Sequence, residues 1–351
     1  MESGALRIVN SVLGDASGGR GQVACDYSRL LSAQGHRVLM LLGRRQRLDA
    51  ARLPPGVEVE LIDNHGHYDL LAAWRLRRLL VGFAPQLAVA HCSRSVALLK
   101  RALGGRAPVL AVSHSHTIRR LLPADACVAL NQSIRARFAM AANGKPCFVI
   151  PNGVQIDARH APGRRQSHRP LRIAALGRFD PVKGFDVFID ALALLKESGR
   201  QFQAVLGGAG AEQRALHGLA AARGLAAQLT FPGWVEDVDR FYTEADILCI
   251  PARSDAFGLT PLQAARAGTP MVLSNAEGHR DMFEPGREAL YADVGDGRQT
   301  ADQLARLMDD PQLGEGLRQA AFQKVLDCYS ESAIAERLSY IVDNVVNKSN
   351  I

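Results

Sequence analysis

The segment from Pro251 to Val272 constrains the fold of this chain more than any other. It follows ADILCI at 245–250, a short apolar, β-branched run that ends at a proline and is typical of a strand buried on both faces of a parallel sheet. Pro261 suits the first turn of a helix, because the N–H that proline lacks has no partner there, and Gly268 suits the end of that helix. The sequence therefore predicts a strand, a turn and a helix in direct succession.

Phe257, Gly258 and Leu259 occupy the predicted turn. In an open α/β fold, such a turn lies at the carboxyl edge of the sheet. Free backbone N–H groups and the positive end of the helix dipole attract anions there. We therefore expect a ligand that carries phosphate to bind at this turn.

The length and composition of the chain indicate a globular protein of two domains. At 351 residues it exceeds what one core comfortably supports, so two domains of roughly 150 to 180 residues are expected. No apolar run reaches the roughly 18 to 20 residues that span a bilayer, and the N-terminus does not resemble a secretory signal. The six cysteines show no CxxC spacing, which favours reduced thiols in a cytoplasmic protein.

Basic residues are concentrated in the first part of the chain. Residues 1–150 hold 20 Lys and Arg against 9 Asp and Glu, a net +11; residues 151–351 hold 22 against 26, a net −4, which together give the overall +7. This excess predicts that the first part meets anionic material, for which nucleic acid, an anionic membrane surface and an acidic glycan or lipid acceptor all qualify. Aromatic residues make up only 6% of the chain, which argues against nucleic acid.

The N-terminal residues read as a βαβ unit. Residues 6–13 form an apolar strand, and Gly18 and Gly19 form a turn before a helix and a second strand. Glycines in this turn let a ligand approach the backbone closely, although a plain connection between strand and helix stays open. Three arginines after the second strand are expected in a solvated loop, with acceptor binding as the alternative: Arg44, Arg45 and Arg47.

The segment 69–83 is both apolar and basic, and two interpretations stay open. It can lie at a membrane interface. However, Arg75 and Arg77 project about 160° apart at helical spacing, so the polar face is not continuous. We therefore favour a helix that covers the sheet, with Trp74 in the core rather than at a membrane.

Two further predicted strands, 85–92 and 107–117, end in histidine-containing segments. The carboxyl end of a parallel strand faces the ligand cleft, so His91, His114 and His116 are candidates for ligand contact, with a purely structural role as the alternative for each. No carboxylate or cysteine completes a ligand spacing around them, so we expect no zinc site.

A polar segment at 157–170 separates the two parts of the chain. It contains two prolines and shows no periodicity, and a new apolar strand follows it. We therefore predict an N-terminal Rossmann-like domain of residues 1–168 and a C-terminal Rossmann-like domain of residues 169–331.

Several short runs occur in the order and spacing of one known family. They are GGRG (18–21), PNGV (151–154), GRFDPVKGFDVFIDAL (177–192), LGGAGAEQRAL (206–216) and FPGWVEDVDRFYTEADILCIP (231–251). With the Phe-Gly-Leu turn, the chain resembles the retaining family 4 glycosyltransferases (glycosyl transferases group 1) over nearly its whole length. The resemblance implies a GT-B fold, in which two Rossmann-like domains with parallel sheets face each other. It also implies that the C-terminal helix, residues 332–351, crosses back to the N-terminal, acceptor-binding domain.

The resemblance assigns roles to individual residues. Arg178 and Lys183 match cations that pair with the two phosphates of a nucleotide sugar, and both side chains suit phosphate oxygens. His114 matches a residue that touches the transferred sugar. The remaining positions implied to bind the donor are Gly18, Gly19, Gly208, Gly210, Gly233, Trp234, Val235, Phe257, Gly258, Leu259, Thr260 and Gln263. For Trp234 a place in the core is the alternative.

Two positions depart from the family pattern. Asp255 and Gln263 stand where the family has two glutamates eight positions apart. Gln263 can accept a hydrogen bond from a ribose hydroxyl without charge assistance, a loss of roughly 1 kcal/mol. Asp255 is one methylene shorter than glutamate, so its carboxylate reaches the sugar hydroxyls differently.

Two kinds of cofactor are not expected. No DxD motif follows a strand, so we predict no metal and no cofactor besides the donor substrate. Gly208 and Gly210 form a GxG, but Gln213 stands where a dinucleotide fingerprint has its third glycine, which argues against an NAD enzyme.

The sequence thus predicts a metal-independent glycosyltransferase. It would move a sugar from a UDP- or GDP-sugar to a glycan, lipopolysaccharide or glycolipid acceptor, and the resemblance implies retention of configuration by front-face substitution. We expect a cytoplasmic enzyme in peripheral contact with an anionic membrane at the inner face. The alternatives are a catalytically impaired nucleotide-sugar-binding subunit, which the residues at 255 and 263 motivate, and an epimerase, which lacks a clear set of paired acids.

Overall fold

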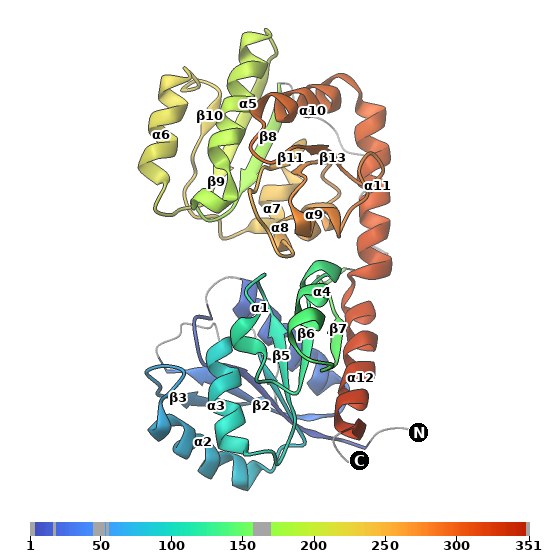
Figure 1. Ribbon diagram of the computed structural model, residues 1–351. Helices are drawn as coiled ribbons and strands as arrows, with labels where there is room; N and C mark the ends of the chain where they lie inside the picture. Colours follow the sequence, from blue (N-terminus) through green and yellow to red (C-terminus); the bar gives the residue numbers. More distant parts are fainter. Residues whose placement is uncertain (1–3, 17–18, 45–52, 54–55, 157–169, 349–351) are drawn as a thin grey trace. The chain divides into compact units, whose positions relative to one another are not determined.

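The computed structural model describes residues 4–16, 19–44, 53, 56–156 and 170–348 (Figure 1). The chain divides into two compact units. Unit 1 comprises Met1–Asn152 and Glu331–Ile351, and unit 2 comprises Gly153–Ser330. The boundary predicted at residues 168 and 169 falls in a segment outside the described residues.

The described part of unit 1 is built on a seven-stranded parallel sheet. In spatial order its strands are β3 (Glu58–Ile62), β2 (Arg37–Gly43), β1 (Arg7–Val12), β4 (Leu87–Ala90), β5 (Val109–Ser113), β6 (Ala126–Ala129) and β7 (Cys147–Val149). Nearly every position of the central strands is buried, because helices cover both faces of the sheet.

Two hydrophobic clusters lie on the two faces of this sheet. One contains residues of α2 (Leu70–Phe83), α3 (Ser93–Leu103) and α4 (Gln132–Ala141), together with the short 3₁₀ helix Arg119–Leu121. The other contains residues of α1 (Gly19–Ala33) and α12 (Glu331–Lys348). Unit 1 is therefore a three-layer α/β/α arrangement.

The last helix, α12, belongs to unit 1 although it follows unit 2 in the sequence. Its buried residues recur at helical spacing, and they are Ile334, Leu338, Ile341, Val342 and Val345. At its start the Arg29 guanidinium pairs with the Glu331 carboxylate at 2.7 Å, and the Gln34 amide donates to the Ala335 carbonyl at 2.8 Å. The predicted return of this helix to the first domain is confirmed.

The prediction that Trp74 lies in the core is wrong. Its side chain is 52% exposed, whereas α2 buries Ala72, Ala73 and Leu76. The helical period places Trp74 on the side opposite these residues. Among the described residues, no helix combines the length and the apolar content needed to cross a membrane.

The described part of unit 2 contains a six-stranded parallel sheet. In spatial order its strands are β10 (Leu229–Thr230), β9 (Phe202–Gly207), β8 (Leu171–Leu176), β11 (Ile247–Ile250), β12 (Met271–Ser274) and β13 (Leu290–Ala292). The helices are the 3₁₀ helix Pro181–Lys183, α5 (Phe185–Glu197), α6 (Gln213–Ala222), α7 (Val238–Thr243), α8 (Leu259–Arg266), α9 (Glu277–Arg280), α10 (Gly297–Asp309) and α11 (Pro311–Cys328).

Both sheets share one topological feature. In each sheet the strand order reverses at the first strand of the unit. Later strands are added first on one side of it and then on the other, so β1 lies between β2 and β4, and β8 lies between β9 and β11. Ligands of open α/β sheets bind outside the carboxyl ends of the strands at such a switch point. The loops after β1, β4, β8 and β11 are therefore where a site is expected.

Candidate functional site

A lysine and an aspartate meet at the switch point of unit 2. Lys183 ends the 3₁₀ helix that follows β8, and Asp255 lies in the loop that follows β11. The Lys183 Nζ lies 2.9 Å from the Asp255 Oδ2. Their side chains are only 28% and 14% exposed, so this ion pair is largely withdrawn from water.

A third titratable side chain lies beside this pair. The His279 Nε2 is 3.9 Å from the Asp255 Oδ2, and the His279 Nδ1 is 3.0 Å from the Ser274 carbonyl oxygen, to which it donates. Burial raises the pKa of Asp255, but Lys183, His279 and the Phe257 N–H outweigh it, so the pKa lies below its usual value. Burial lowers the pKa of His279, which is therefore neutral near pH 7. The sequence analysis missed His279, although it lies shortly after the carboxyl end of β12, where such a residue could be sought.

Glycines allow the loops around Asp255 to touch. Gly184 has φ +64°, and a Cβ there would lie 2.2 Å from the Pro251 carbonyl oxygen. The Gly278 N–H donates to the Asp255 carbonyl at 3.1 Å, and a Cβ on Gly278 would lie 2.4 Å from that oxygen. Any larger residue at either position would push these backbones apart.

The N-terminus of α8 lies beside Asp255. Its N-cap residue is Gly258, which contributes no side-chain acceptor, and the helix begins at Leu259. Backbone N–H groups in the first turn of a helix lack intrahelical partners and attract anions. Phe257 is buried against the Tyr329 ring, with ring centroids 5.6 Å apart, so it anchors this turn. The turn predicted from the sequence is thus present, next to the Lys183 cation.

The loops predicted to bind the base and the phosphates also lie together. The Gly208 N–H donates to the Gly233 carbonyl at 2.8 Å, which links the loop after β9 to the loop after β10. Gly208 and Gly210 have φ +134° and +159°, and a Cβ on either would overlap the backbone of residues 177–179. Trp234 is 73% exposed, so the alternative that it lies in the core is excluded. The Val235 side chain packs closely against Gly207, because a Cβ on Gly207 would lie 2.8 Å from the Val235 Cγ2.

Arg178 and Gln263 have local partners. Arg178 pairs with Asp180 at 3.1 Å, and its side chain is 66% exposed. The Tyr242 hydroxyl donates to the Gln263 Oε1 at 3.4 Å, so this carbonyl oxygen already has a partner inside the unit. Thr260 hydrogen-bonds with the same tyrosine.

Unit 1 holds a pair of histidines at the carboxyl edge of its sheet. His91 follows β4 and His114 follows β5, and the His91 Nδ1 lies 3.1 Å from the His114 Nε2. Burial, the neighbouring ring and Arg20 hold the pKa of His91 well below its usual value, and burial lowers the pKa of His114 to about 3. Both rings are therefore neutral near pH 7. The sequence analysis identified His114 as a candidate but did not predict that its ring would contact the His91 ring.

The other candidates in unit 1 do not join this pair. Gly19 begins α1, and Gly18 lies outside the described residues, as do Arg45 and Arg47. Arg44 lines a separate cavity of about 180 Å³ beyond the ends of β1, β2 and β3, with Arg94 and Asp63. His116 is partly buried on the loop after β5.

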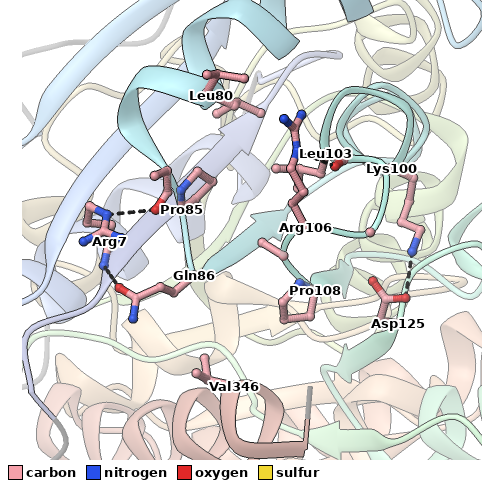
Figure 2. Close-up of a pocket in the computed structure, with 14 residues that line it drawn as sticks. Arg7, Leu80, Pro85, Gln86, Lys100, Leu103, Arg106, Pro108, Asp125 and Val346 are labelled. Atoms are coloured by element: carbon pink, nitrogen blue, oxygen red, sulfur yellow. Dashed lines mark hydrogen bonds and ion pairs between the residues drawn. The ribbon is translucent and has the colours of Figure 1, made fainter. Parts of the chain in front are cut away.

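A larger cavity, about 530 Å³, lies at the opposite edge of this sheet (Figure 2). It adjoins Arg7, Gln86 and Asp125, next to the amino ends of β1, β4 and β6. Its polar groups bind one another: the Gln86 Oε1 accepts from the Arg7 N–H at 3.0 Å, and Lys100 pairs with Asp125 at 2.7 Å. The carboxyl edges, rather than this cavity, therefore hold the chemistry.

Two family models match the chain. The model "Glycosyltransferase Family 4" matches residues 17–158, and the model "Glycosyl transferases group 1" matches residues 160–324. Together they account for most of unit 1 and most of unit 2.

Curated relatives agree with these models. A phosphatidyl-myo-inositol mannosyltransferase of Mycobacterium leprae is 29% identical over 220 residues, 61% of this chain and 58% of that protein. A lipopolysaccharide core biosynthesis glycosyltransferase of Rhizobium meliloti, LpsD, is 26% identical over 79% of this chain and 81% of its own length. The match to an alpha-D-kanosaminyltransferase of Streptomyces kanamyceticus covers 45% of that relative, so the chain spans about half the length of some relatives that it matches.

Solved structures identify the fold. The structure of Anabaena Alr3699/HepE in complex with UDP and glucose superposes with a TM-score of 0.81 at 18% identity, over 96% of this chain and 99% of that one. The sucrose-phosphate synthase of Thermosynechococcus elongatus gives a TM-score of 0.82 at 18% identity, over 97% of this chain and 99% of that one. The protein thus has the GT-B fold of glycosyltransferases. More narrowly, the chain belongs to the family 4 glycosyltransferases, glycosyl transferases group 1.

Proposed function

We propose that the protein is a metal-independent, retaining glycosyltransferase that takes its sugar from a UDP- or GDP-sugar. The acceptor is a hydroxyl of a glycan, lipopolysaccharide or glycolipid. The named activities of the relatives, which act on inositol lipids and the lipopolysaccharide core, support this acceptor class. The UDP and glucose in the HepE structure support the donor class.

The observation that carries the proposal is the Lys183–Asp255 pair beside the N-terminus of α8. Departure of a nucleoside diphosphate requires neutralisation of its developing charge, which fixed cations and helix N-termini can supply. The Lys183 ammonium has three donors, so it can hold Asp255 and still donate to a phosphate oxygen. Asp255 keeps the ammonium in place between reactions, and Arg178 supplies a second, more exposed cation.

The proposal extends to location. The excess of basic residues in the first part of the chain supports peripheral contact with an anionic membrane at the inner face, where a lipid-linked acceptor would be met.

Substitution of Lys183 tests the site. We expect Lys183→Ala to lower the transfer rate by at least about 100-fold, because removal of one electrostatic donor typically costs that much. The change in melting temperature produced by UDP or GDP should shrink in the same variant. Lys196→Ala serves as the control, because Lys196 lies at the far end of α5, where its ammonium donates to the Gly224 carbonyl. An unchanged transfer rate in Lys183→Ala would remove the assignment.

One observation favours a second candidate, a catalytically impaired subunit that binds nucleotide sugars. The Gln263 carbonyl oxygen, which would otherwise be open to a ribose hydroxyl, accepts from Tyr242. Hydrolysis of UDP- and GDP-sugars without acceptor separates the two candidates. Released sugar supports the enzyme, and its anomeric configuration, followed by NMR, tests retention. Nucleotide binding without sugar release supports the subunit.

A further inference from the structure

Two cysteines lie opposite each other on the last two strands of the unit 1 sheet. Cys127 in β6 is the registered partner of Cys147 in β7, and residues paired in this way on parallel strands project to the same face. Both side chains pack in the hydrophobic cluster on the α2, α3 and α4 side. The two thiols hydrogen-bond with each other, and neither is in a disulfide. They therefore form a dithiol at the edge of the sheet.

The two thiols differ in their access to solvent. Cys127 is completely buried, whereas Cys147 is half-buried. The hydrogen bond to Cys147 and burial raise the pKa of the Cys127 thiol. The same hydrogen bond and the Arg135 cation hold the pKa of Cys147 below its usual value, although burial opposes them. Cys147 is therefore the thiol that ionises and reacts first, because the thiolate is the nucleophile.

A cavity of about 470 Å³ adjoins Cys147, with walls from α4, β7 and α12. It contains two arginines, Arg135 on α4 and Arg337 on α12, and one acid, Glu336. Arg135 donates to the Gln132 Oε1 at 3.2 Å, but among the described residues no carboxylate pairs with either arginine. The cavity thus offers two cations to the carboxylates of a ligand, next to a reactive thiol.

The strand geometry permits a disulfide between the two cysteines. Neighbouring strands lie about 4.8 Å apart, within the range of about 4.4 to 6.8 Å that a disulfide spans between Cα atoms. The same spacing separates the Cβ atoms by somewhat more than the roughly 3.8 Å of a relaxed disulfide. β7 has only three residues and lies at the edge of the sheet, so it can move to close this difference. The resulting bond carries some strain, and strained disulfides are readily reduced.

We propose that Cys147 and Cys127 react as a dithiol with small disulfides that carry carboxylate groups, which bind at Arg135 and Arg337. First, the Cys147 thiolate attacks one sulfur of the small disulfide, whose S–S bond breaks. One small thiolate leaves and takes up the proton that Cys147 lost. The Cys127 sulfur then attacks the Cys147 Sγ and displaces the second small thiolate, which takes the Cys127 proton. Two electrons and two protons pass from the cysteines to the small disulfide, so no further oxidant is needed.

The position of the dithiol determines what its oxidation changes. A disulfide fixes β7 to β6 just before Asn152, after which the chain enters unit 2. Cys328 on α11 provides a comparison within the same chain. It is also half-buried, but within the described residues no hydrogen bond joins it to another cysteine. The proposal does not depend on the donor site of unit 2.

Glutathione disulfide is the probe for the order of the two steps. After incubation of the native full chain, alkylation and peptide mass mapping should show the loss of two of the six thiols and a Cys127–Cys147 link. In Cys127→Ala the second step is blocked, so Cys147 should keep one glutathione. In Cys147→Ala neither thiol should react, and Cys328→Ala should behave as the unchanged chain. Reaction of Cys127 in Cys147→Ala, or glutathione on Cys328 as fast as on Cys147, would overturn the proposal.

The two arginines are tested by comparing probes of different charge. Arg135→Gln/Arg337→Gln should lower the ratio of the Cys147 rate with glutathione disulfide to that with neutral hydroxyethyl disulfide about fivefold, because exposed ion pairs contribute little each. The ratio removes any effect on the thiol itself. Arg75→Gln/Arg101→Gln, which removes two exposed arginines of unit 1 outside the cavity, should leave the ratio unchanged. Equal ratios in both double variants would refute the carboxylate site.

Two further measurements keep the result independent of folding and of the donor site. If the native chain does not react with glutathione disulfide but the urea-unfolded chain does, the dithiol is inaccessible and the proposal is refuted. Melting shifts with UDP and GDP are measured on the reduced chain. Intact nucleotide shifts without the dithiol reaction count against this proposal alone, whereas absent nucleotide shifts with a normal dithiol reaction support it and count against the donor site.

Discussion

The carboxyl edges of the two sheets bury titratable side chains under opposite electrostatic conditions. In unit 2, Lys183 and Asp255 keep their charges, because each lies beside the other and the carboxylate also accepts from a backbone N–H. In unit 1, the ring nitrogens of His91 and His114 lie 3.1 Å apart, yet burial and the nearby Arg20 cation keep both rings neutral. The charged edge suits the diphosphate of the donor proposed above. The other edge, where the family resemblance implies that His114 touches the transferred sugar, carries no charge near pH 7.

The largest expected effect follows from breaking the charged pair. Asp255→Asn leaves the Lys183 ammonium without its counter-charge, and we expect a loss of about 3 kcal/mol in the stability of unit 2, as for other mostly buried pairs that lose one partner. Urea unfolding followed by circular dichroism measures this loss. Adding Lys183→Met to Asp255→Asn should recover part of it, because no unpaired charge then remains.

A neighbouring ion pair provides the control. Arg253 and Asp186 pair nearby, but both side chains are 39% exposed. Asp186→Asn should cost less than about 1 kcal/mol, since water screens an exposed pair. Equal losses in Asp186→Asn and Asp255→Asn would mean that burial does not distinguish the Lys183 site.

The next effect is the acid sensitivity of the neutral pair. The folded pKa of His114 is about 3, below the usual value of about 6.5 that applies on unfolding, so the unfolded chain binds more protons between these values. Stability therefore falls as the pH drops below about 6.5, and protonation of His114 accounts for about 2 kcal/mol of that loss at pH 5. Urea unfolding at pH 7.5, 6.0 and 5.0 should show this decline.

Replacement of one ring should reduce the pH slope. In His91→Gln one of the two groups no longer titrates, so the decline in stability between pH 7.5 and 5 should become shallower. An unchanged slope in His91→Gln would contradict the neutral pair.

The smallest expected effect concerns the donor side. Gln263→Glu adds a charged acceptor near the N-terminus of α8, where a carboxylate is also favoured by the helix dipole. We expect UDP or GDP to bind about fivefold more tightly, about 1 kcal/mol, because charge-assisted hydrogen bonds are stronger. Isothermal titration calorimetry measures this, and weaker binding would show that Tyr242 and Gln263 do not face the nucleotide.

The sequence predicted those parts of the site that lie next to one another along the chain. The turn at Phe257 and Gly258 and the start of α8 follow from a strand, a proline and a glycine within about twenty residues. His279 and the His91–His114 contact were not predicted, because a single sequence does not show which residues on different loops face one another. Trp74 was misplaced for a similar reason: an apolar residue on an amphipathic helix is assigned to the core by default, and only packing reveals which face is covered.

The sequence by itself determined that the chain forms two parallel sheets, since apolar runs and helical periods arise from local chemistry. It also determined that cations and a helix N-terminus follow the strands of the second sheet. Only the tertiary structure decided that Lys183 and Asp255, 72 positions apart, form one ion pair, and that the Trp74 face of α2 is left uncovered. The order of the strands in each sheet explains both the ion pair and the uncovered helix face. It brings loops that are distant in sequence to one edge of a sheet, and it leaves one side of an outer helix in water.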